Sequence, residues 1–306
     1  MQVSTIASLC QLCPRDCQVN REEGQLGVCK VSAQIKVARA ALHYWEEPSI
    51  SGTKGSGAVF FSGCSLHCVY CQNHEIAQGV YGKEISKERL AEIFLELQAQ
   101  GANNINLVTP GQYVPQIVWS VEQARKQGLL IPIVYNTSSY EKVDTLKQLE
   151  GIVDVYLPDF KYWDAQLAQK YSKAPDYPAV AKAAIAEMVR QQPVCQFFYD
   201  KEQGCDLIQK GVIVRQLLLP GQLKDAKNIV KYLRDTYGEQ IYISLMSQYT
   251  PLEHVQEYPE LNRRVSKRTY EKYIDYALEI GVENGYIQDG NVAEESFIPD
   301  FDGAGV

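Results

Sequence analysis

Residues 58–73 read AVFFSGCSLHCVYCQN, an apolar β-forming run that leads directly into a loop with three cysteines. Cys64, Cys68 and Cys71 have the spacing CxxxCxxC. Three thiolates can bind three irons of a [4Fe-4S] cluster and leave the fourth iron open, whereas an electron-transfer cluster normally has every iron bound by protein. The spacing therefore predicts a [4Fe-4S] site at which a substrate or cofactor binds the open iron.

Short apolar runs alternate with helical patterns along the rest of the chain. Six runs predict strands that are buried on both faces: 58–63, 105–111, 131–138, 153–161, 212–221 and 240–247. Helical patterns lie at 86–101, which opens on a serine cap, and at 114–128. This alternation predicts an α/β fold, a partial (β/α)6 barrel with its active site at the carboxyl ends of the strands. An open doubly wound sheet is the competing fold.

The N-terminal part does not follow this alternation. We therefore expect a cysteine-rich, metal-binding extension over 1–50 and the barrel over 51–306. Within the extension, the run IKVARAALHYWEEP at 35–48 predicts a strand that packs on the barrel. Near the other end, GYIQDGN at 285–291 predicts a last short strand.

The extension contains a second group of cysteines: Cys10, Cys13, Cys17 and Cys29. Closely spaced thiols in a reducing compartment more often bind metal than form disulfides. Four thiolates complete the ligand shell of either a zinc ion or a second iron–sulfur cluster, and the spacing does not separate the two. Cys195 and Cys205 stand apart from both groups, and we expect them to be ordinary thiols.

The stretch CSLHCVYCQN resembles the hallmark CxxxCx(aromatic)C of the radical S-adenosylmethionine superfamily. Within it, the chain looks most like the activating enzymes of glycyl radical enzymes, in particular pyruvate formate-lyase activating enzyme, over about residues 55–250. The resemblance implies that the open iron binds S-adenosylmethionine and that an electron from the cluster cleaves it to a 5′-deoxyadenosyl radical, which abstracts hydrogen. The protein would orient and shield these cofactors.

The same resemblance implies partners. The hydrogen would come from a glycine of a partner glycyl radical enzyme, and a low-potential donor such as flavodoxin or ferredoxin would reduce the cluster. One alternative is a radical enzyme that acts on a small molecule or another peptide. A second alternative is an iron–sulfur electron carrier or sensor with no turnover of its own.

Charged residues at the ends of predicted strands support a cofactor pocket. Asp159 and Lys161 lie two residues apart on one strand, so their side chains point to the same side. Arg215 lies in the apolar run VIVRQLLL, where a buried guanidinium must find an anion. The resemblance implies that Lys161 and Arg215 contact the cofactor carboxylate while Asp159 organises the site. We expect Arg215 to have no permanent protein partner, although a purely structural network is the alternative.

Other cofactor contacts rest on the resemblance alone. The positions that match are Tyr70, Thr109, Gly111, Asn136, Thr137 and Gln248. Tyr70 would lie near the adenine. Gln112 is neutral where the family carries a glutamate that holds the amino group, so this recognition would depend on backbone carbonyls near Thr109 and Gly111. His67 lies inside the motif, and we expect it to have a structural role beside the cluster rather than a catalytic one.

Charge and hydropathy narrow the class of protein. The formal net charge of −7 over 306 residues argues against a general binder of nucleic acid. No apolar run is long enough to span a membrane, and the N-terminal residues lack the features of an export signal. We therefore expect a cytoplasmic protein without a membrane or nucleic-acid partner.

Overall fold

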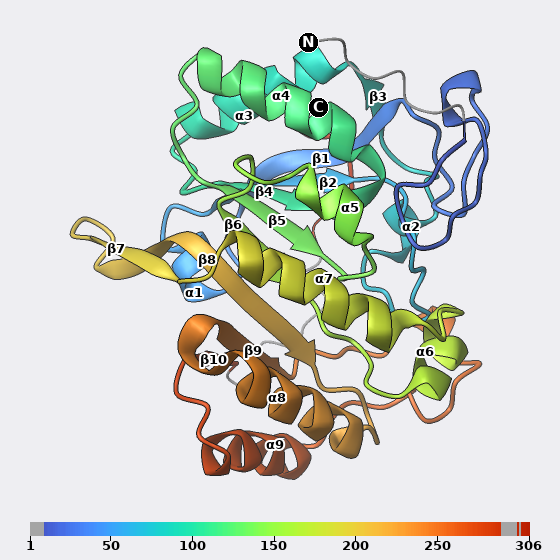
Figure 1. The fold of residues 1–306 in the computed structure, drawn as a ribbon, viewed down its shortest axis with the longest axis vertical. Coiled ribbons are helices and arrows are strands. Elements are labelled where there is room, and N and C mark those ends of the chain that lie inside the picture. Colours follow the sequence, from blue (N-terminus) through green and yellow to red (C-terminus); the bar gives the residue numbers. More distant parts are fainter. Residues whose placement is uncertain (1–8, 289–298, 300) are drawn as a thin grey trace.

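The structure is a computed structural model that describes residues 9–288, 299 and 301–306. Its strands form a sheet in the order β10-β9-β8-β6-β5-β4-β2-β1-β3, and β7 pairs with β8 beside this path (Figure 1). The strands are β1 (Ile35–His43), β2 (Ser56–Phe61), β3 (Lys83–Ile85), β4 (Ile105–Val108), β5 (Ile133–Thr137), β6 (Val155–Pro158), β7 (Gln196–Asp200), β8 (Cys205–Leu217), β9 (Tyr242–Met246) and β10 (Gly285–Ile287).

The parallel part of the sheet contains the six predicted strands. Neighbouring strands run parallel from β2 through β4, β5, β6, β8 and β9 to β10. Every residue of β2, β4, β5 and β6 is buried, as expected for strands covered on both faces. The predicted α/β fold with a partial (β/α)6 barrel is confirmed, and β10 adds a last strand at one end of the sheet order. It matches the first part of the strand predicted at 285–291, of which residues 289–291 lie outside the described residues.

Helices cross over between these strands. They are α1 (Pro48–Ser51), α2 (His74–Ala77), α3 (Lys87–Ala99), α4 (Val114–Lys126), α5 (Val143–Lys147), α6 (Ala165–Ser172), α7 (Tyr177–Gln191), α8 (Leu223–Tyr237) and α9 (Lys267–Glu279). The predicted serine cap begins α3, because the Ser86 hydroxyl accepts a hydrogen bond from the Arg89 amide at 3.1 Å. Figure 1 shows α4, α5, α7 and α8 in front of the sheet. No helix in the described ranges is long and apolar enough to cross a membrane.

The strand predicted at 35–48 is part of the sheet itself. β1 pairs antiparallel with β2, from Val37 opposite Phe61 to His43 opposite Ser56, and its other side pairs with β3. The main chain near the C-terminus also reaches this strand, because the Ala40 amide donates to the Ala304 carbonyl at 2.9 Å. The residues at and after the end of β1 reach the functional site described below, because His43, Trp45 and Glu46 line its cavity.

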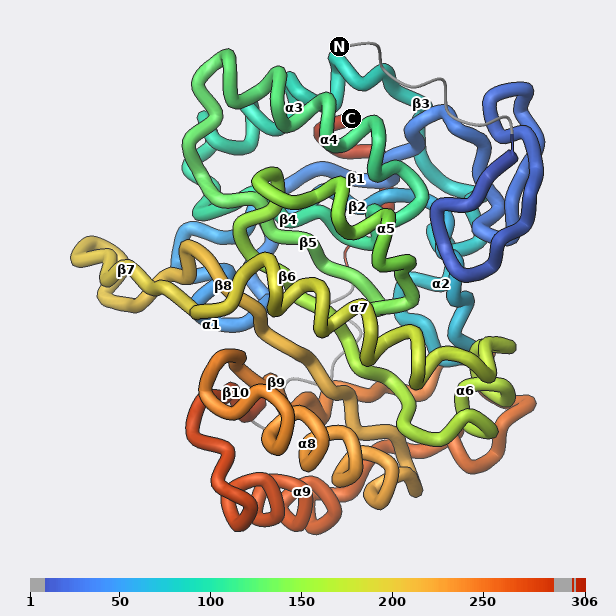
Figure 2. Tube along the Cα trace, in the orientation of Figure 1, coloured from blue at the N-terminus to red at the C-terminus, as the bar shows by residue number. Residues whose placement is uncertain are grey.

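A hairpin extends β8 beyond its predicted start. β7 and the first half of β8 pair antiparallel, from Phe198 opposite Leu207 to Asp200 opposite Cys205, and the hairpin projects from the body of the molecule (Figures 1 and 2). Phe198 and Tyr199 are exposed there. The apolar run at 212–221 predicted only the buried second half of β8, because the exposed half lacks a continuous apolar pattern.

Candidate functional site

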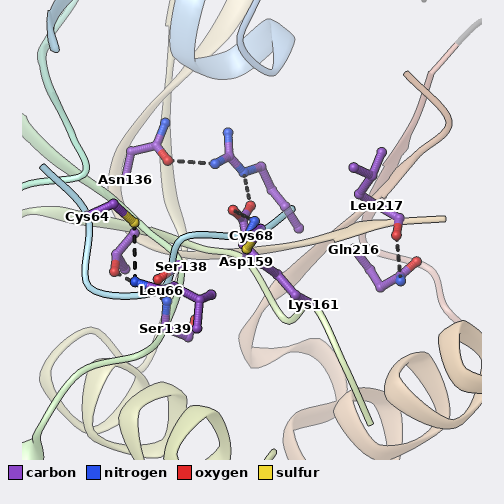
Figure 3. Close-up of polar contacts among 12 residues, drawn as sticks. Cys64, Leu66, Cys68, Asn136, Ser138, Ser139, Asp159, Lys161, Gln216 and Leu217 are labelled. Atoms are coloured by element: carbon purple, nitrogen blue, oxygen red, sulfur yellow. Dashed lines mark hydrogen bonds and ion pairs between the residues drawn. The ribbon is translucent and has the colours of Figure 1, made fainter. Parts of the chain in front are cut away.

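The loop after β2 holds the three cysteines of the predicted cluster. Only Ser62 and Gly63 separate the strand from Cys64. The Leu66 amide donates a hydrogen bond to the Cys64 sulfur at 3.4 Å (Figure 3), and the Ser172 hydroxyl donates to the Cys68 sulfur at 3.2 Å. Both sulfurs are therefore positioned by neighbouring donors, one within the loop and one at the end of α6.

One cavity of about 230 Å³ collects most of the predicted site residues at the carboxyl ends of the strands. The residues predicted for the site that line it are Cys64, Cys68, Cys71, Tyr70, Thr109, Asn136, Thr137, Asp159, Lys161, Arg215 and Gln248. His43, Trp45 and Glu46, which follow or end β1, line it as well and were not predicted. Gly111 does not line this cavity but a smaller one beside the N-terminal cysteines.

The chemistry of the three thiols fits a [4Fe-4S] cluster with one open iron. Burial raises the pKa of the Cys71 thiol to about 12, with a further increase from Cys68 and Cys64, and burial also raises the pKa of Cys64. The Cys64 and Cys71 thiols would therefore keep their protons at neutral pH and release them on binding iron. As the side chains stand, no three or more His, Cys, Asp or Glu groups among the described residues could hold a metal ion. In a [4Fe-4S] cluster each thiolate binds a different iron, so the three sulfurs need not converge on one ion.

A buried ionic network lines the same cavity as the three cysteines. Lys161 Nζ lies 2.7 Å from Asp159 Oδ2, and Arg215 Nε donates to Asp159 Oδ1 at 2.8 Å. Burial raises the pKa of Asp159, but the charges of Arg215 and Lys161 outweigh this effect and hold it below its usual value. Figure 3 shows Asp159 and Lys161 close to Cys68. The carboxylate is therefore ionised at neutral pH.

Arg215 has permanent protein partners, so the expectation that it has none is wrong. Its guanidinium bonds Asp159, donates from Nη1 to Glu46 Oε2 at 3.0 Å, and donates from Nη2 to the Asn136 side-chain oxygen. Burial lowers the pKa of Arg215, but Asp159 and Glu46 more than offset this and raise it overall. The buried guanidinium of Arg215 therefore has its counter-anions within the protein, in the carboxylates of Asp159 and Glu46.

Glu46 is the main residue of the site that the sequence did not predict. Its Oε1 accepts hydrogen bonds from the side-chain amides of Asn106 at 2.9 Å and Asn136 at 3.2 Å, while Oε2 bonds Arg215. Only 10% of its side-chain surface is exposed. The one available signal was the pair of acidic residues at the end of the run IKVARAALHYWEEP, which was interpreted only as part of a strand; β1 ends earlier, at His43.

Tyr70 is packed among other aromatic residues at the edge of the cavity. Its ring makes edge-to-face contacts with Tyr162, Tyr171 and Tyr249, with centroids 6.2 to 6.4 Å apart. The residue is only 7% exposed. These aromatic contacts hold the Tyr70 ring in one position. Its predicted contact with adenine stays a prediction.

The loop after β4 bonds to the cysteine loop. Thr109 has a positive φ of 58°. The side-chain amide of Gln112 donates from Nε2 to the Thr109 carbonyl at 2.8 Å and to the Ser62 and Gly63 carbonyls at 3.1 Å each. The Gln112 side chain therefore ties the ends of β2 and β4 together. Its amide donors are turned toward main-chain carbonyls, and it offers no charge to a cofactor amino group.

The four N-terminal cysteines lie together on the other side of this loop. Cys10, Cys13, Cys17 and Cys29 line the smaller cavity with Gly111 and Gln112. Glu141, which follows β5, lines it too and was not predicted. The structure thus brings the four thiols predicted to bind metal to one place, separate from the larger cavity.

Comparison with known proteins agrees with this site. Residues 58–199 match the family model described as the Radical SAM superfamily. The uncharacterized protein MJ0674 of Methanocaldococcus jannaschii is 27% identical over 275 residues, which are 88% of this chain and 74% of that protein.

Two solved structures resemble the fold. HydG, a maturase of the [FeFe]-hydrogenase, matches with a TM-score of 0.51 at 15% identity over 77% of this chain and 52% of HydG, which shows a shared fold alone. The chain thus spans about half the length of HydG. A domain of pyruvate-formate lyase-activating enzyme from Bacteroides vulgatus matches with a TM-score of 0.39 at 13% identity over 57% of this chain and 93% of that domain. From the family match, the motif and the parallel sheet, we conclude that residues 58–199 belong to the radical SAM superfamily.

Proposed function

We propose that this protein is an enzyme that binds a [4Fe-4S] cluster through Cys64, Cys68 and Cys71 and cleaves S-adenosylmethionine reductively. The bound cluster and S-adenosylmethionine would supply the electron transfer and the hydrogen-abstracting 5′-deoxyadenosyl radical. The observation that carries this proposal is that the three thiols border the same cavity as the buried Asp159–Lys161–Arg215 network. A simple electron carrier would need no such charged wall.

Lys161 and Arg215 would bind the carboxylate of S-adenosylmethionine. An ammonium has three donors and a guanidinium five, and the contacts described above use one of the former and three of the latter. Both side chains therefore keep donors for an incoming anion. Glu46 and Asp159 would hold the guanidinium in one orientation, so that binding costs little further ordering.

The remaining predicted contacts are proposed for the rest of the cofactor. Tyr70 would border the adenine, and the other groups would face the ribose and the amino acid part: Thr109, Asn136, Thr137 and Gln248. They all line the cavity, which supports this assignment. Gly111 is left out of it, because it lines the other cavity. Backbone carbonyls near Thr109 are therefore the proposed partners of the amino group.

We propose a glycine of a partner glycyl radical enzyme as the hydrogen donor. The support is the sequence resemblance to the activating enzymes and the open order of the sheet in the described residues, in which β3 and β10 form the two ends. An open sheet leaves a side through which a polypeptide loop can approach. A small molecule or a different peptide is the second candidate substrate.

The proposed function requires a reductant and a compartment. Reduction of a low-potential cluster calls for a donor such as flavodoxin or ferredoxin, and we propose one of these as a partner. A reducing, cytoplasmic environment would keep the nine cysteines available for metal.

The experiment uses the full chain, reconstituted anaerobically with iron and sulfide and reduced with dithionite. With S-adenosylmethionine it should release 5′-deoxyadenosine, and with a co-encoded glycyl radical enzyme it should produce a stable glycyl doublet in the electron paramagnetic resonance spectrum. Release of 5′-deoxyadenosine without a doublet, accelerated by a small metabolite, would move the substrate to the second candidate. No release of 5′-deoxyadenosine from a chain with a full cluster would refute the enzymatic function.

We also propose that Cys10, Cys13, Cys17 and Cys29 bind a metal, either zinc or a second iron–sulfur cluster. Their joint position on the smaller cavity supports this assignment. This metal would lie outside the cavity of the radical chemistry.

A further inference from the structure

The main chain around the N-terminal cysteines brings their sulfurs together. The Cys10 amide donates to the Val19 carbonyl at 2.9 Å and the Gln18 amide donates back to the Cys10 carbonyl at 3.1 Å, which closes the loop that holds Cys13 and Cys17. A β-carbon on Gly27 would lie 3.1 Å from the Cys17 sulfur and 3.3 Å from the Cys29 sulfur. A glycine at this position lets both sulfurs approach the same turn.

Glu141 lines the same cavity as the four cysteines and has one carboxylate oxygen without a partner in the described part of the chain. Its Oε1 accepts hydrogen bonds from the Thr137 hydroxyl at 2.7 Å and the Tyr135 hydroxyl at 3.3 Å. Its Oε2 is buried and has no hydrogen-bond partner among the described residues, and the whole residue is only 6% exposed. Burying such an oxygen without a partner is costly. A cation between the thiols would compensate it, which is a second indication of a ligand, independent of the cysteine spacing.

Arg21 places a positive charge beside the cysteines. It lines the same cavity, and its Nη1 lies 4.0 Å from the Cys10 sulfur and donates to the Gln112 carbonyl at 2.7 Å. A guanidinium at this distance would offset part of the negative charge of four thiolate ligands.

The size of the cavity distinguishes a single ion from a cluster. It has a volume of about 20 Å³, and a space of roughly 10 to 15 Å³ holds one water-sized sphere. One zinc ion fits this space after rotation of the thiols, whereas the four irons and four sulfides of a cluster would require the loops to move apart. Tetrahedral coordination by four thiolates is the usual arrangement of structural zinc.

The segment that holds these cysteines also supports the loop of the radical site. The Arg15 guanidinium donates from Nε to the Ser65 carbonyl at 2.8 Å and from Nη2 to the Ser172 carbonyl at 2.8 Å. His67 Nε2 lies 2.8 Å from the Val28 carbonyl. Arg15 thereby joins the chain between Cys64 and Cys68 to the end of α6, and His67 joins the same loop to the N-terminal segment.

We propose that Cys10, Cys13, Cys17 and Cys29 hold one zinc ion, and that this zinc site fastens residues 9–34 against the loop that carries Cys64 and Cys68. The inference rests on the metal-binding role proposed above for the four cysteines, and not on the radical chemistry. Structural zinc sites contribute directly to folding, so the ion would keep Arg15 and the Val28 carbonyl in place.

The first test uses the full chain with Cys64, Cys68 and Cys71 all replaced by alanine, so that its outcome does not depend on the radical cluster. The protein is offered zinc together with iron and sulfide under anaerobic conditions, and its metals are measured. We expect about one zinc per chain and no stoichiometric iron. About four irons, or no metal at all, would overturn the zinc assignment.

Matched variants in the same background identify the ligands. Adding Cys13→Ser or Cys29→Ser should abolish zinc binding, while adding Cys195→Ser should leave it unchanged, because Cys195 lies outside both groups. Zinc retained at full stoichiometry in the first two variants would contradict the proposed ligand set. If a serine variant does not fold, removal of zinc from the parent protein with a chelator replaces it.

The second test measures whether the zinc site supports the loop. Hydrogen exchange is followed with zinc bound and after chelation, and we expect at least tenfold faster exchange in residues 9–34 and 62–70 without zinc but no change in β9. Arg15→Ala should accelerate exchange in residues 62–70 with zinc still bound, and Arg268→Ala, an exposed arginine on α9, should not. Unchanged exchange in residues 62–70 in both experiments would overturn the fastening role.

Discussion

The two groups of cysteines lie in one chain but face different surroundings. Cys64, Cys68 and Cys71 border a cavity of about 230 Å³ with a charged wall, whereas Cys10, Cys13, Cys17 and Cys29 border one of about 20 Å³. Three thiols beside a large space leave room for a ligand on an open iron, and four thiols around a small space leave none. The comparison teaches that groups with a similar number of thiols differ in the space around them, and this difference is the basis for proposing a reactive role for one group and a structural role for the other.

We expect the largest effect from a single substitution that removes the metal of one cysteine group and leaves that of the other. Cys68→Ala removes one of three ligands of the proposed cluster, so we expect loss of the iron and of 5′-deoxyadenosine formation, with the N-terminal zinc retained. Iron, zinc and 5′-deoxyadenosine are measured on the same reconstituted sample. Cys195→Ala is the control and should behave like the wild type. Formation of 5′-deoxyadenosine at the wild-type rate by Cys68→Ala would remove the distinction between the groups.

The charged wall of the larger cavity should contribute strongly to stability. Asp159→Asn leaves Lys161 without its carboxylate partner and Arg215 with Glu46 as its remaining one. Breaking a buried ion pair costs about 3 to 5 kcal/mol, and we expect about 3 kcal/mol because 20% of the Asp159 side chain is exposed. Urea unfolding of the cluster-free chain measures it. Asp144→Asn, at an exposed ion pair, should change stability by less than about 0.5 kcal/mol.

The same network predicts how stability depends on pH. The pKa of Asp159 is lower in the folded protein than in the unfolded chain, so the unfolded state binds more protons in the acid range. Its contribution is fully present above the unfolded pKa, near 3.9, and is lost as the pH falls through the folded value. Between pH 6 and pH 3 the wild type should lose more unfolding free energy than Asp159→Asn. Equal losses in the two proteins would mean that Asp159 is not held in its charged form.

The smallest expected effect concerns the packing of the N-terminal group. Gly27→Ala places a methyl group 3.1 and 3.3 Å from two sulfurs, so these must shift by a few tenths of an ångström. Inserting a methyl group into a well-packed region costs about 1 kcal/mol in the mildest cases. If this cost falls on the zinc-bound form, zinc should bind roughly fivefold more weakly. Competition with a zinc chelator measures this change in the triple alanine variant. Leu26→Ala, at the neighbouring exposed residue, should bind zinc as tightly as its parent.

Local patterns were sufficient for much of the fold. The six parallel strands and the serine cap of α3 were predicted from apolar periodicity and one capping residue, because both depend on residues close in sequence. The first half of β8 was missed, since it is stabilised by pairing with β7 rather than by burial. β1 was predicted as a strand, but its place within the sheet depends on the register with β2.

The sequence by itself was sufficient to select the candidate site residues. The spacing CxxxCxxC, the four N-terminal cysteines and the charged residues at strand ends are local features, and in this fold the ends of parallel strands necessarily meet at one edge of the sheet. The larger cavity therefore contains nearly every residue that was predicted for it.

Only the tertiary structure decided how these residues are paired. Glu46 reaches Arg215 across 169 positions of sequence, and Arg15 reaches the Ser172 carbonyl across 157. Glu141 faces the N-terminal cysteines although it follows a strand of the sheet. Such contacts depend on strand order and on the path of the N-terminal segment over the loops. A charged residue in an apolar run of sequence indicates that its side chain needs a partner of opposite charge. Which residue becomes that partner depends on the tertiary structure.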